Sequence, residues 1–174
     1  IQSQRVISTV KHYALNDQET GRMFLDVRIG DAAARESDLL AFQLAIEHGQ
    51  PGAVMCAYNR INGAYGCGND YLLNQVLKRD WGYSGWVMSD WGAVHGVEDV
   101  LDFGEPLAKA AAGDAAYAAR VTDMNRRILR SIYAVGVDAA PPADPKIDFQ
   151  AHGDVAERVA RAGIVLLRNE RNTL

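Results

Sequence analysis

Three short apolar runs, each ending in polar side chains, constrain the fold of this 174-residue chain more than any other feature. The runs cover residues 6–10, 53–57 and 86–88, and segments with helical periodicity separate them. Because apolar runs that alternate with amphipathic helices are typical of parallel sheets, we predict a series of β/α units. A β/α barrel and a doubly wound sheet both have this pattern, so periodicity alone leaves the choice between them open.

Two amphipathic helices are predicted between these runs. The first is expected from Asp31 to His48, with Asp31 as its cap and Gly49 as its end. The second is expected to begin after residues 69–70 and to end before Gly82. Their apolar stripes consist of Leu39, Phe42 and Ile46 in the first helix, and of Leu72, Leu73, Val76 and Leu77 in the second.

The pattern changes after Asp114, where a long amphipathic helix is predicted up to Gly136. Residues 137–145 contain three prolines and indicate a linker. Beyond it, we expect Asp154 to cap a further helix that leads into a strand at residues 164–167. The chain is therefore predicted to hold a first domain, a linker and the start of a second α/β domain: residues 1–136, 137–150 and 151–174.

Composition argues against several classes of protein. No apolar stretch approaches the roughly 18 residues that cross a bilayer, so we expect no membrane-spanning segment. The net charge of −4 and the pI near 5.5 argue against a nucleic-acid partner, because proteins of that class carry a concentrated basic face. The histidines, at positions 12, 48, 95 and 152, lack metal-ligand spacing, so we expect neither a metal nor another cofactor.

The segment Gly85–Gly92 contains the strongest candidate for chemistry. It places Asp90 directly after the third apolar run, with Trp91 beside it. The strand would hold the carboxylate in a fixed position, and an indole offers a flat apolar surface on which a sugar ring can stack. A capping Asp next to a core Trp explains the same residues, so this segment alone leaves both interpretations open.

Several blocks in the same order resemble those of one enzyme family. Residues 11–19, 54–63 and 85–92 resemble the Lys-His, Met-x-x-Tyr-Asn and Ser-Asp-Trp blocks of family 3 glycoside hydrolases. Residues 126–129 and 162–169 resemble the barrel exit and the entry to the second domain of that family. The resemblance implies an α/β fold, namely the C-terminal part of a (β/α)8-type barrel with a linker into a second α/β sandwich domain.

The resemblance assigns roles to the polar strand ends. It implies that Asp90 is the nucleophile of a double displacement, forming a glycosyl ester that water hydrolyses with retained configuration. Lys11 and His12 match residues that hydrogen-bond sugar hydroxyls. Tyr58 matches a tyrosine near the nucleophile. Because a nucleophile must be ionised, we expect Tyr58 and Lys11 to be donors near the Asp90 carboxylate.

Further positions are matched less specifically. Met55 matches a residue that lines the same pocket, and a plain core position explains it equally well. Trp91 matches the aromatic residue at the mouth of the glucose site, and Arg22 matches an arginine assigned to substrate binding. Cys56 and Cys67 bracket a loop that some secreted relatives close with a disulfide. Composition leaves the compartment unknown: a disulfide would suit a secreted or periplasmic protein, as the match suggests, and two free thiols would suit a cytosolic one.

The implied activity is the release of terminal β-D-glucose from β-glucosides or cello-oligosaccharides, as in a β-glucosidase. In such enzymes the general acid/base follows the position of Leu174, and the first barrel strands precede that of Ile1. We therefore expect this chain to need the rest of a parent polypeptide. Any targeting segment is absent or lies outside the chain, and a homo-oligomer is compatible with the sequence.

Alternatives remain at this point. A β-xylosidase or a β-N-acetylglucosaminidase of the same family is one; the latter carries a Gly-His-Gly loop where residues 14–18 contain no His, which favours the glucosidase. The stretch from His95 to Pro106 is shorter than in most family members, and this puts the last barrel strand in doubt. A catalytically incomplete sugar-binding fragment is the alternative outside the enzymes. A doubly wound nucleotide-binding domain is disfavoured, because no strand end has a Gly-rich phosphate turn.

Overall fold

The computed structural model describes residues 1–95, 105–139 and 146–165. Its contacts divide the chain into two compact units, residues 1–140 and 141–174. No described helix combines the length and the apolar character needed to cross a membrane. The shortened stretch noted after His95 falls largely on residues 96–104, outside the described residues.

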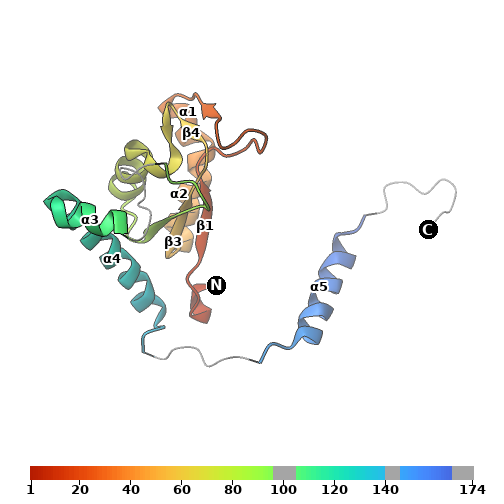
Figure 1. The fold of residues 1–174 in the computed structure, drawn as a ribbon. Coiled ribbons are helices and arrows are strands. Elements are labelled where there is room, and N and C mark those ends of the chain that lie inside the picture. The colour runs from red at the N-terminus through yellow and green to blue at the C-terminus, as the bar shows by residue number, and fades with distance from the viewer. Residues whose placement is uncertain (96–104, 140–145, 166–174) are drawn as a thin grey trace. The chain divides into compact units, whose positions relative to one another are not determined.

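A three-stranded parallel sheet forms the centre of the first unit (Figure 1). Its order is β1 (Thr9–Tyr13), β3 (Ala53–Cys56) and β6 (Trp86–Ser89). In register, Val54 pairs with Val10 on one side and with Val87 on the other. The three apolar runs are thus parallel neighbours, which confirms the parallel sheet predicted from their alternation with helices.

The first strand begins later than its apolar run predicted. It starts at Thr9 rather than at residue 6, and it contains Lys11 and His12 instead of ending before them. The reason lies in its partner, because β3 begins only at Ala53, directly after Pro51 and Gly52. Proline has no backbone N–H to extend a ladder of hydrogen bonds. The register with β3 shifts between Val10 and Tyr13, the part of the strand that contains Lys11 and His12.

The helix predicted from Asp31 to His48 is in fact two helices, α1 (Asp31–Glu36) and α2 (Asp38–Gly49). They separate at Ser37, whose φ of −116° and ψ of −105° are not helical and whose hydroxyl donates to Ala33 O. Asp31 does not cap the first helix, since Gly30 holds that position and Asp31 instead pairs with Arg35. The expected end is displaced by one residue, because Gln50 takes the left-handed conformation with φ of 44°.

The second predicted helix is η3 (Tyr71–Asp80), which has π-helical hydrogen bonding. Asn69 accepts a hydrogen bond from Leu72 N at its start, and Gly82 with φ of +63° follows its end, as the sequence predicted. Its apolar stripe is buried against the sheet and α2. The largest fully buried side chains of this core are Tyr13, Leu39, Val54, Leu72, Val76 and Leu77.

A second, smaller sheet lies at the carboxyl end of β3 and was not predicted. It consists of β2 (Asp26–Val27), β4 (Arg60–Ile61) and β5 (Ala64–Tyr65), with β2 parallel and β5 antiparallel to β4. Asn62 and Gly63 connect β4 to β5 with positive φ angles of 52° and 97°. An Asn-Gly pair is the preferred sequence for a tight hairpin turn of this kind.

Helix α4 (Ala115–Val135) follows α3 (Glu105–Gly113) and confirms the predicted long helix. Asp114 caps it through Ala116 N, and Gly136 ends it with φ of 69°. This helix also contacts the amino ends of two strands. Ser131 Oγ donates to Gly52 O at 2.8 Å, just before β3, and Arg127 Nη1 donates to Tyr83 O at 2.8 Å, three residues before β6. The short helix η1 (Gln2–Gln4) contacts α4 as well.

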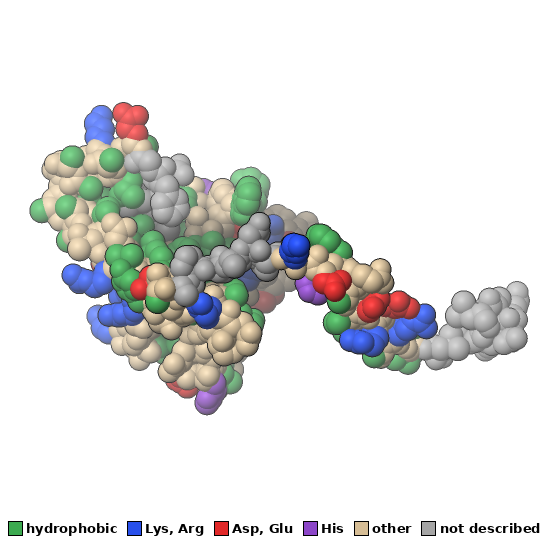
Figure 2. All heavy atoms as spheres, turned by 90° about the horizontal axis from the view of Figure 1, so that it is seen from below, with side chains coloured by type: hydrophobic (Ala, Val, Ile, Leu, Met, Phe, Trp, Pro, Cys, Tyr) green, Lys and Arg blue, Asp and Glu red, His purple; other side chains and the backbone are tan. Residues whose placement is uncertain are grey.

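The described part of the second unit is the helix α5 (Phe149–Gly163). It begins before Asp154, so the predicted cap is wrong; Asp148 caps it by accepting from Ala151 N. Asp148 lies six residues earlier, and its side chain pairs with a backbone N–H of the first turn that has no partner within the helix, so the helix begins at Phe149. Figure 2 shows apolar side chains exposed along this helix among acidic and basic ones. Of the strand predicted at residues 164–167, the first two residues are not in a strand and the rest lie outside the described residues.

Candidate active site

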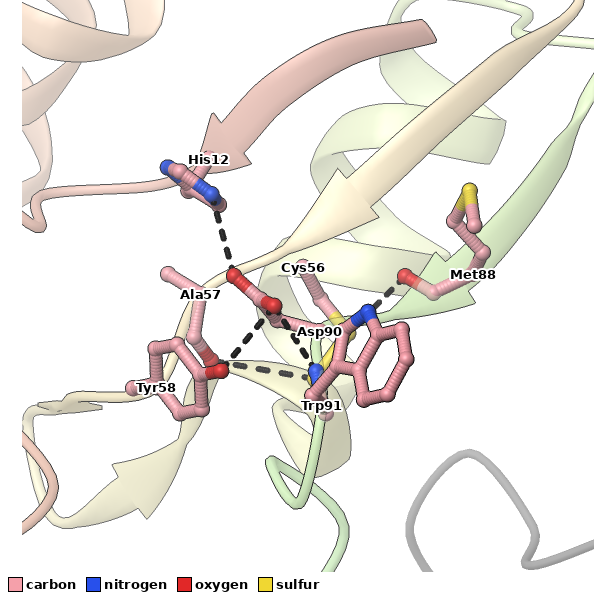
Figure 3. The surroundings of a disulfide bond; sticks show 8 residues. His12, Cys56, Ala57, Tyr58, Met88, Asp90 and Trp91 are labelled. Carbon is pink, nitrogen blue, oxygen red and sulfur yellow. Dashed lines mark hydrogen bonds and ion pairs between the residues drawn. A yellow bond between two sulfur atoms is a disulfide. The ribbon is translucent and has the colours of Figure 1, made fainter.

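The carboxylate of Asp90 is the centre of the candidate site (Figure 3). Its Oδ2 lies 3.0 Å from His12 Nε2, and its Oδ1 accepts a hydrogen bond from the Tyr58 hydroxyl at 3.0 Å. Oδ1 also accepts from the backbone N–H of Trp91 at 2.7 Å. The Asp90 side chain is 13% exposed. Both carboxylate oxygens are therefore held by donors at a site that remains open to solvent.

The three side chains come together because the strands are parallel and in register. Ser89, the last residue of β6, pairs with Cys56, the last residue of β3, so Asp90 and Tyr58 both follow at the same edge of the sheet. His12 reaches this edge from β1. Carboxyl ends of parallel strands are where β/α folds place their chemistry.

Contacts to both oxygens fix the rotamer of the Asp90 carboxylate. Burial raises the pKa of Tyr58, and the hydrogen bond to Asp90 raises it further, while the Arg22 cation acts in the opposite direction. The phenol therefore keeps its proton at neutral pH and stays a donor. This arrangement is suited to an anionic nucleophile that attacks in one defined direction.

Arg22 contacts the ring of Tyr58 and so lies next to the site. Its guanidinium carbon Cζ is 4.4 Å from the centre of the Tyr58 ring, and its Nη1 is 2.9 Å from Glu19 Oε2. Lys11, expected among the donors to Asp90, is exposed. Within the described ranges, the side chain of β1 that contacts Asp90 is that of His12.

The remaining predicted residues lie around this centre. Met55 is half-buried in β3 and pairs in register with Met88 of β6. Trp91 is 90% exposed, so its indole is available to a ligand. In the part of the chain that the structure describes, no group of three or more His, Cys, Asp or Glu residues is arranged to hold a metal ion.

A disulfide between Cys56 and Cys67 lies next to the site (Figure 3). Both cysteines are fully buried. Cys56 Sγ is 3.3 Å from Met88 O, and Cys67 Sγ is 3.7 Å from Ala57 O. These sulfur atoms carry no proton, so the contacts are packing contacts between the disulfide and the chain that precedes Asp90 and Tyr58. The pairing implied by the resemblance is present.

Sequence reasoning missed the aromatic stack at the end of the hairpin. The rings of Tyr65 and His95 stack with centres 3.6 Å apart and planes inclined by 14°. Arg60 also contacts Tyr65: its guanidinium carbon Cζ is 4.4 Å from the ring centre, and its Nη2 donates to the Tyr65 hydroxyl at 2.9 Å. The Asn62-Gly63 turn is the signal that could have predicted this hairpin.

Known proteins resemble this chain over its whole length. Residues 1–124 match the Glycosyl hydrolase family 3 N terminal domain. The chain is 36% identical, over 204 aligned residues, to the probable β-glucosidase L of Aspergillus terreus, covering all of this chain and 28% of that protein. It is 36% identical, over 180 residues, to an exo-α-(1→6)-L-arabinopyranosidase of Bifidobacterium longum, covering 98% of this chain and 24% of that protein.

Solved structures give the same result. A β-glucosidase from Streptomyces venezuelae in complex with D-glucose is 34% identical, with a TM-score of 0.83 over 100% of this chain and 26% of that one. A family 3 β-glucosidase from Bifidobacterium adolescentis is 33% identical, with a TM-score of 0.81 over 99% of this chain and 27% of that one. This chain thus spans about a quarter of the length of its relatives. Its sequence match and its α/β fold together show that the chain belongs to glycosyl hydrolase family 3.

Proposed function

We propose that this chain is the nucleophile-bearing part of a retaining β-glucosidase, with Asp90 as the nucleophile. The observation that carries the proposal is the Asp90 carboxylate, held by His12, Tyr58 and the Trp91 amide at the carboxyl edge of a parallel sheet. Relatives named β-glucosidase, at about 35% identity, support the same substrate class.

The proposed reaction is a double displacement. Asp90 attacks the anomeric carbon with its electron pair, the glycosidic bond breaks, and an acid protonates the departing oxygen. Water then attacks the same carbon and gives its proton to the group that acted as the acid, which is now a base, while the ester bond breaks and its electrons return to Asp90. The released product is β-D-glucose with retained configuration. The acid that assists these steps is proposed to lie in the parent polypeptide beyond this chain.

The other site residues would bind the sugar. Lys11 is exposed beside His12 and carries three N–H donors for sugar hydroxyls. His12 can bind a hydroxyl with the nitrogen that does not face Asp90. The exposed indole of Trp91 offers a stacking surface, and Met55 contributes apolar lining.

The proposal includes an architecture. The first unit would be the C-terminal part of a (β/α)8-type barrel ending at residue 136, followed by a linker at 137–150 and the start of a second α/β domain at 151–174. The parallel order of β1, β3 and β6, with helices between successive strands, supports the barrel part. The remaining strands and the acid/base would come from the rest of the parent polypeptide.

One observation favours a second substrate. The relative named exo-α-(1→6)-L-arabinopyranosidase is as similar to this chain as the one named β-glucosidase. Both enzymes act on a pyranose ring, so the same nucleophile could serve either. Comparing kcat/KM for aryl β-D-glucoside and aryl α-L-arabinopyranoside, with the full-length protein, decides between them. A preference for the arabinoside would refute the glucosidase assignment and leave the nucleophile in place.

The nucleophile is tested by trapping it. A 2-deoxy-2-fluoroglucosyl inactivator slows hydrolysis of the ester, so peptide mapping of the inactivated full-length protein should find the label on Asp90. Asp90→Asn keeps the shape of the side chain and removes the attacking charge, so turnover should fall by several orders of magnitude while folding is retained. Asp70→Asn is the control, because Asp70 is exposed and bonds to Asn74 on η3. A label on another carboxylate would overturn the assignment.

A further inference from the structure

Arg22 and Tyr58 form a contact that the proposed reaction does not use directly. We propose that Arg22 is a positioning residue, which acts on Asp90 by holding the Tyr58 ring in the orientation that directs its hydroxyl to the carboxylate. The guanidinium lies 4.4 Å from the ring centre, and the hydroxyl on that ring is 3.0 Å from Asp90 Oδ1. The inference relies on the proposed function only for the role of Asp90.

Both partners of this contact are fixed to the same small sheet. The turn that carries Arg22 is closed by hydrogen bonds from Phe24 N and Leu25 N to Gly21 O. Leu25 O then accepts from Arg60 N at 2.8 Å, two residues after Tyr58. The distance between the guanidinium and the phenol ring is thus set by backbone hydrogen bonds as well as by the attraction between the two groups.

The guanidinium of Arg22 also forms an ion pair with Glu19. Glu19 Oε2 pairs with Nη1 of Arg22 at 2.9 Å, and the Arg22 side chain is 31% exposed. A planar cation over an aromatic face contributes about 0.5–1 kcal/mol at an exposed site and more where water is excluded. Tyr58 is 6% exposed, so the Arg22 side chain covers a ring that is otherwise inside the protein. These contacts support the role of Arg22 in holding the ring of Tyr58 in position.

A double-mutant cycle in the full-length protein separates this role from direct substrate binding. Arg22→Met keeps much of the apolar length of the side chain and removes the cation, so we expect kcat on aryl β-glucosides to fall about 2- to 5-fold. In a Tyr58→Phe background the ring no longer reaches Asp90 with a hydroxyl. In that background Arg22→Met should lower kcat no further. In the protein that keeps Tyr58, Arg22→Lys retains a cation and should therefore keep part of the activity that Arg22→Met loses.

Losses that multiply in the double variant, or a rise in KM without a change in kcat, would overturn the proposal, because an arginine that binds sugar hydroxyls acts independently of the Tyr58 hydroxyl. Arg28→Met is the matched control. Arg28 belongs to the same loop region, is 71% exposed and pairs with Asp26. Its removal should leave kcat unchanged.

A second measurement does not depend on catalysis. In protein with 13C-labelled tyrosine, the Tyr58 signal is identified by its absence from Tyr58→Phe, and its titration is followed at alkaline pH. The cation beside the ring favours the ionised phenol, so Arg22→Met should raise the pKa of Tyr58, whereas Arg28→Met should not. An unchanged titration would refute the contact itself. A changed titration combined with a label on a carboxylate other than Asp90 would refute the proposed nucleophile and leave the contact intact.

Discussion

The hydroxyl of Tyr58 allows the proposed mechanism to be tested one step at a time. Tyr58→Phe removes a single oxygen atom and keeps the buried ring. Asp90 Oδ1 then retains the Trp91 amide at 2.7 Å, and Oδ2 retains His12 at 3.0 Å. The carboxylate is therefore still held, and the substitution changes only how well its negative charge is stabilised.

The two chemical steps should respond unequally. Asp90 loses its charge as the glycosyl ester forms and regains it as water releases the sugar. A hydrogen bond to a charged acceptor contributes about 1.5–3 kcal/mol, against about 0.5–1.5 kcal/mol for a neutral one. The Tyr58 hydrogen bond therefore stabilises the second transition state, relative to the ester, by up to about 1–1.5 kcal/mol. Its loss should slow release of the ester by about 5- to 13-fold.

Formation of the ester should not be slowed, because the hydrogen bond is strongest to the free carboxylate and weakens during that step. The assay is stopped-flow release of the phenol from an aryl β-glucoside with a good leaving group, using the full-length protein. We expect kcat to fall by the stated factor, a burst of phenol to appear or grow, and kcat/KM to change less than kcat. Tyr133→Phe is the control, since Tyr133 is 59% exposed on α4. Equal losses in kcat and kcat/KM, without a burst, would refute the argument.

Three further predictions concern stability of the full-length protein. Replacing Cys56 and Cys67 with Ser opens a loop closed over a separation of 11 residues, so the free energy of unfolding in urea should fall by about 3 kcal/mol; a loss near zero would contradict this. Burial and neighbouring cations lower the pKa of Lys78 from 10.5 to about 8. Between these two pKa values the unfolded chain binds more protons than the folded one, so the free energy of unfolding that depends on Lys78 rises with pH. The Tm of the unsubstituted protein should therefore rise relative to that of Lys78→Met as the pH increases above about 8. In Gly66→Ala, the new Cβ would lie 2.8 Å from Ala57 O, so Tm should fall; an unchanged Tm would show that the loop adapts.

The sequence predicted the central sheet because each of its strands corresponds to a run of consecutive apolar residues, which can be recognised without knowledge of distant contacts. Three apolar runs with polar ends sufficed to bring His12, Tyr58 and Asp90 to one edge, and the observed register agrees. The roles of these residues in a reaction remain predictions. The start of β1 was misplaced, because it depends on where its partner begins, and Pro51 precedes that partner by only two residues.

Other features depend on contacts that no local pattern encodes. The break between α1 and α2 at Ser37 interrupts a continuous helical pattern, so periodicity gave no sign of it. The contact between Arg22 and Tyr58 joins residues 36 positions apart through strands of two residues each, which are too short for a periodic signal. The sequence indicated which residues could lie near Asp90, and tertiary pairing determined which of them are in contact.

The contacts of α4 determine which parts of the first unit should tolerate substitutions and insertions. Ser131 and Arg127 fasten the chain where β3 and β6 begin, whereas Tyr58 and Asp90 emerge where those strands end. Four residues of strand, about 13 Å, separate the two edges. Loops at the far edge can therefore be exchanged or lengthened, by evolution or by protein engineering, without loosening the anchorage that sets the strands in register. New substrate preferences should be obtainable from substitutions in the loops, while substitutions at Ser131 or Arg127 should be tolerated poorly whatever the substrate.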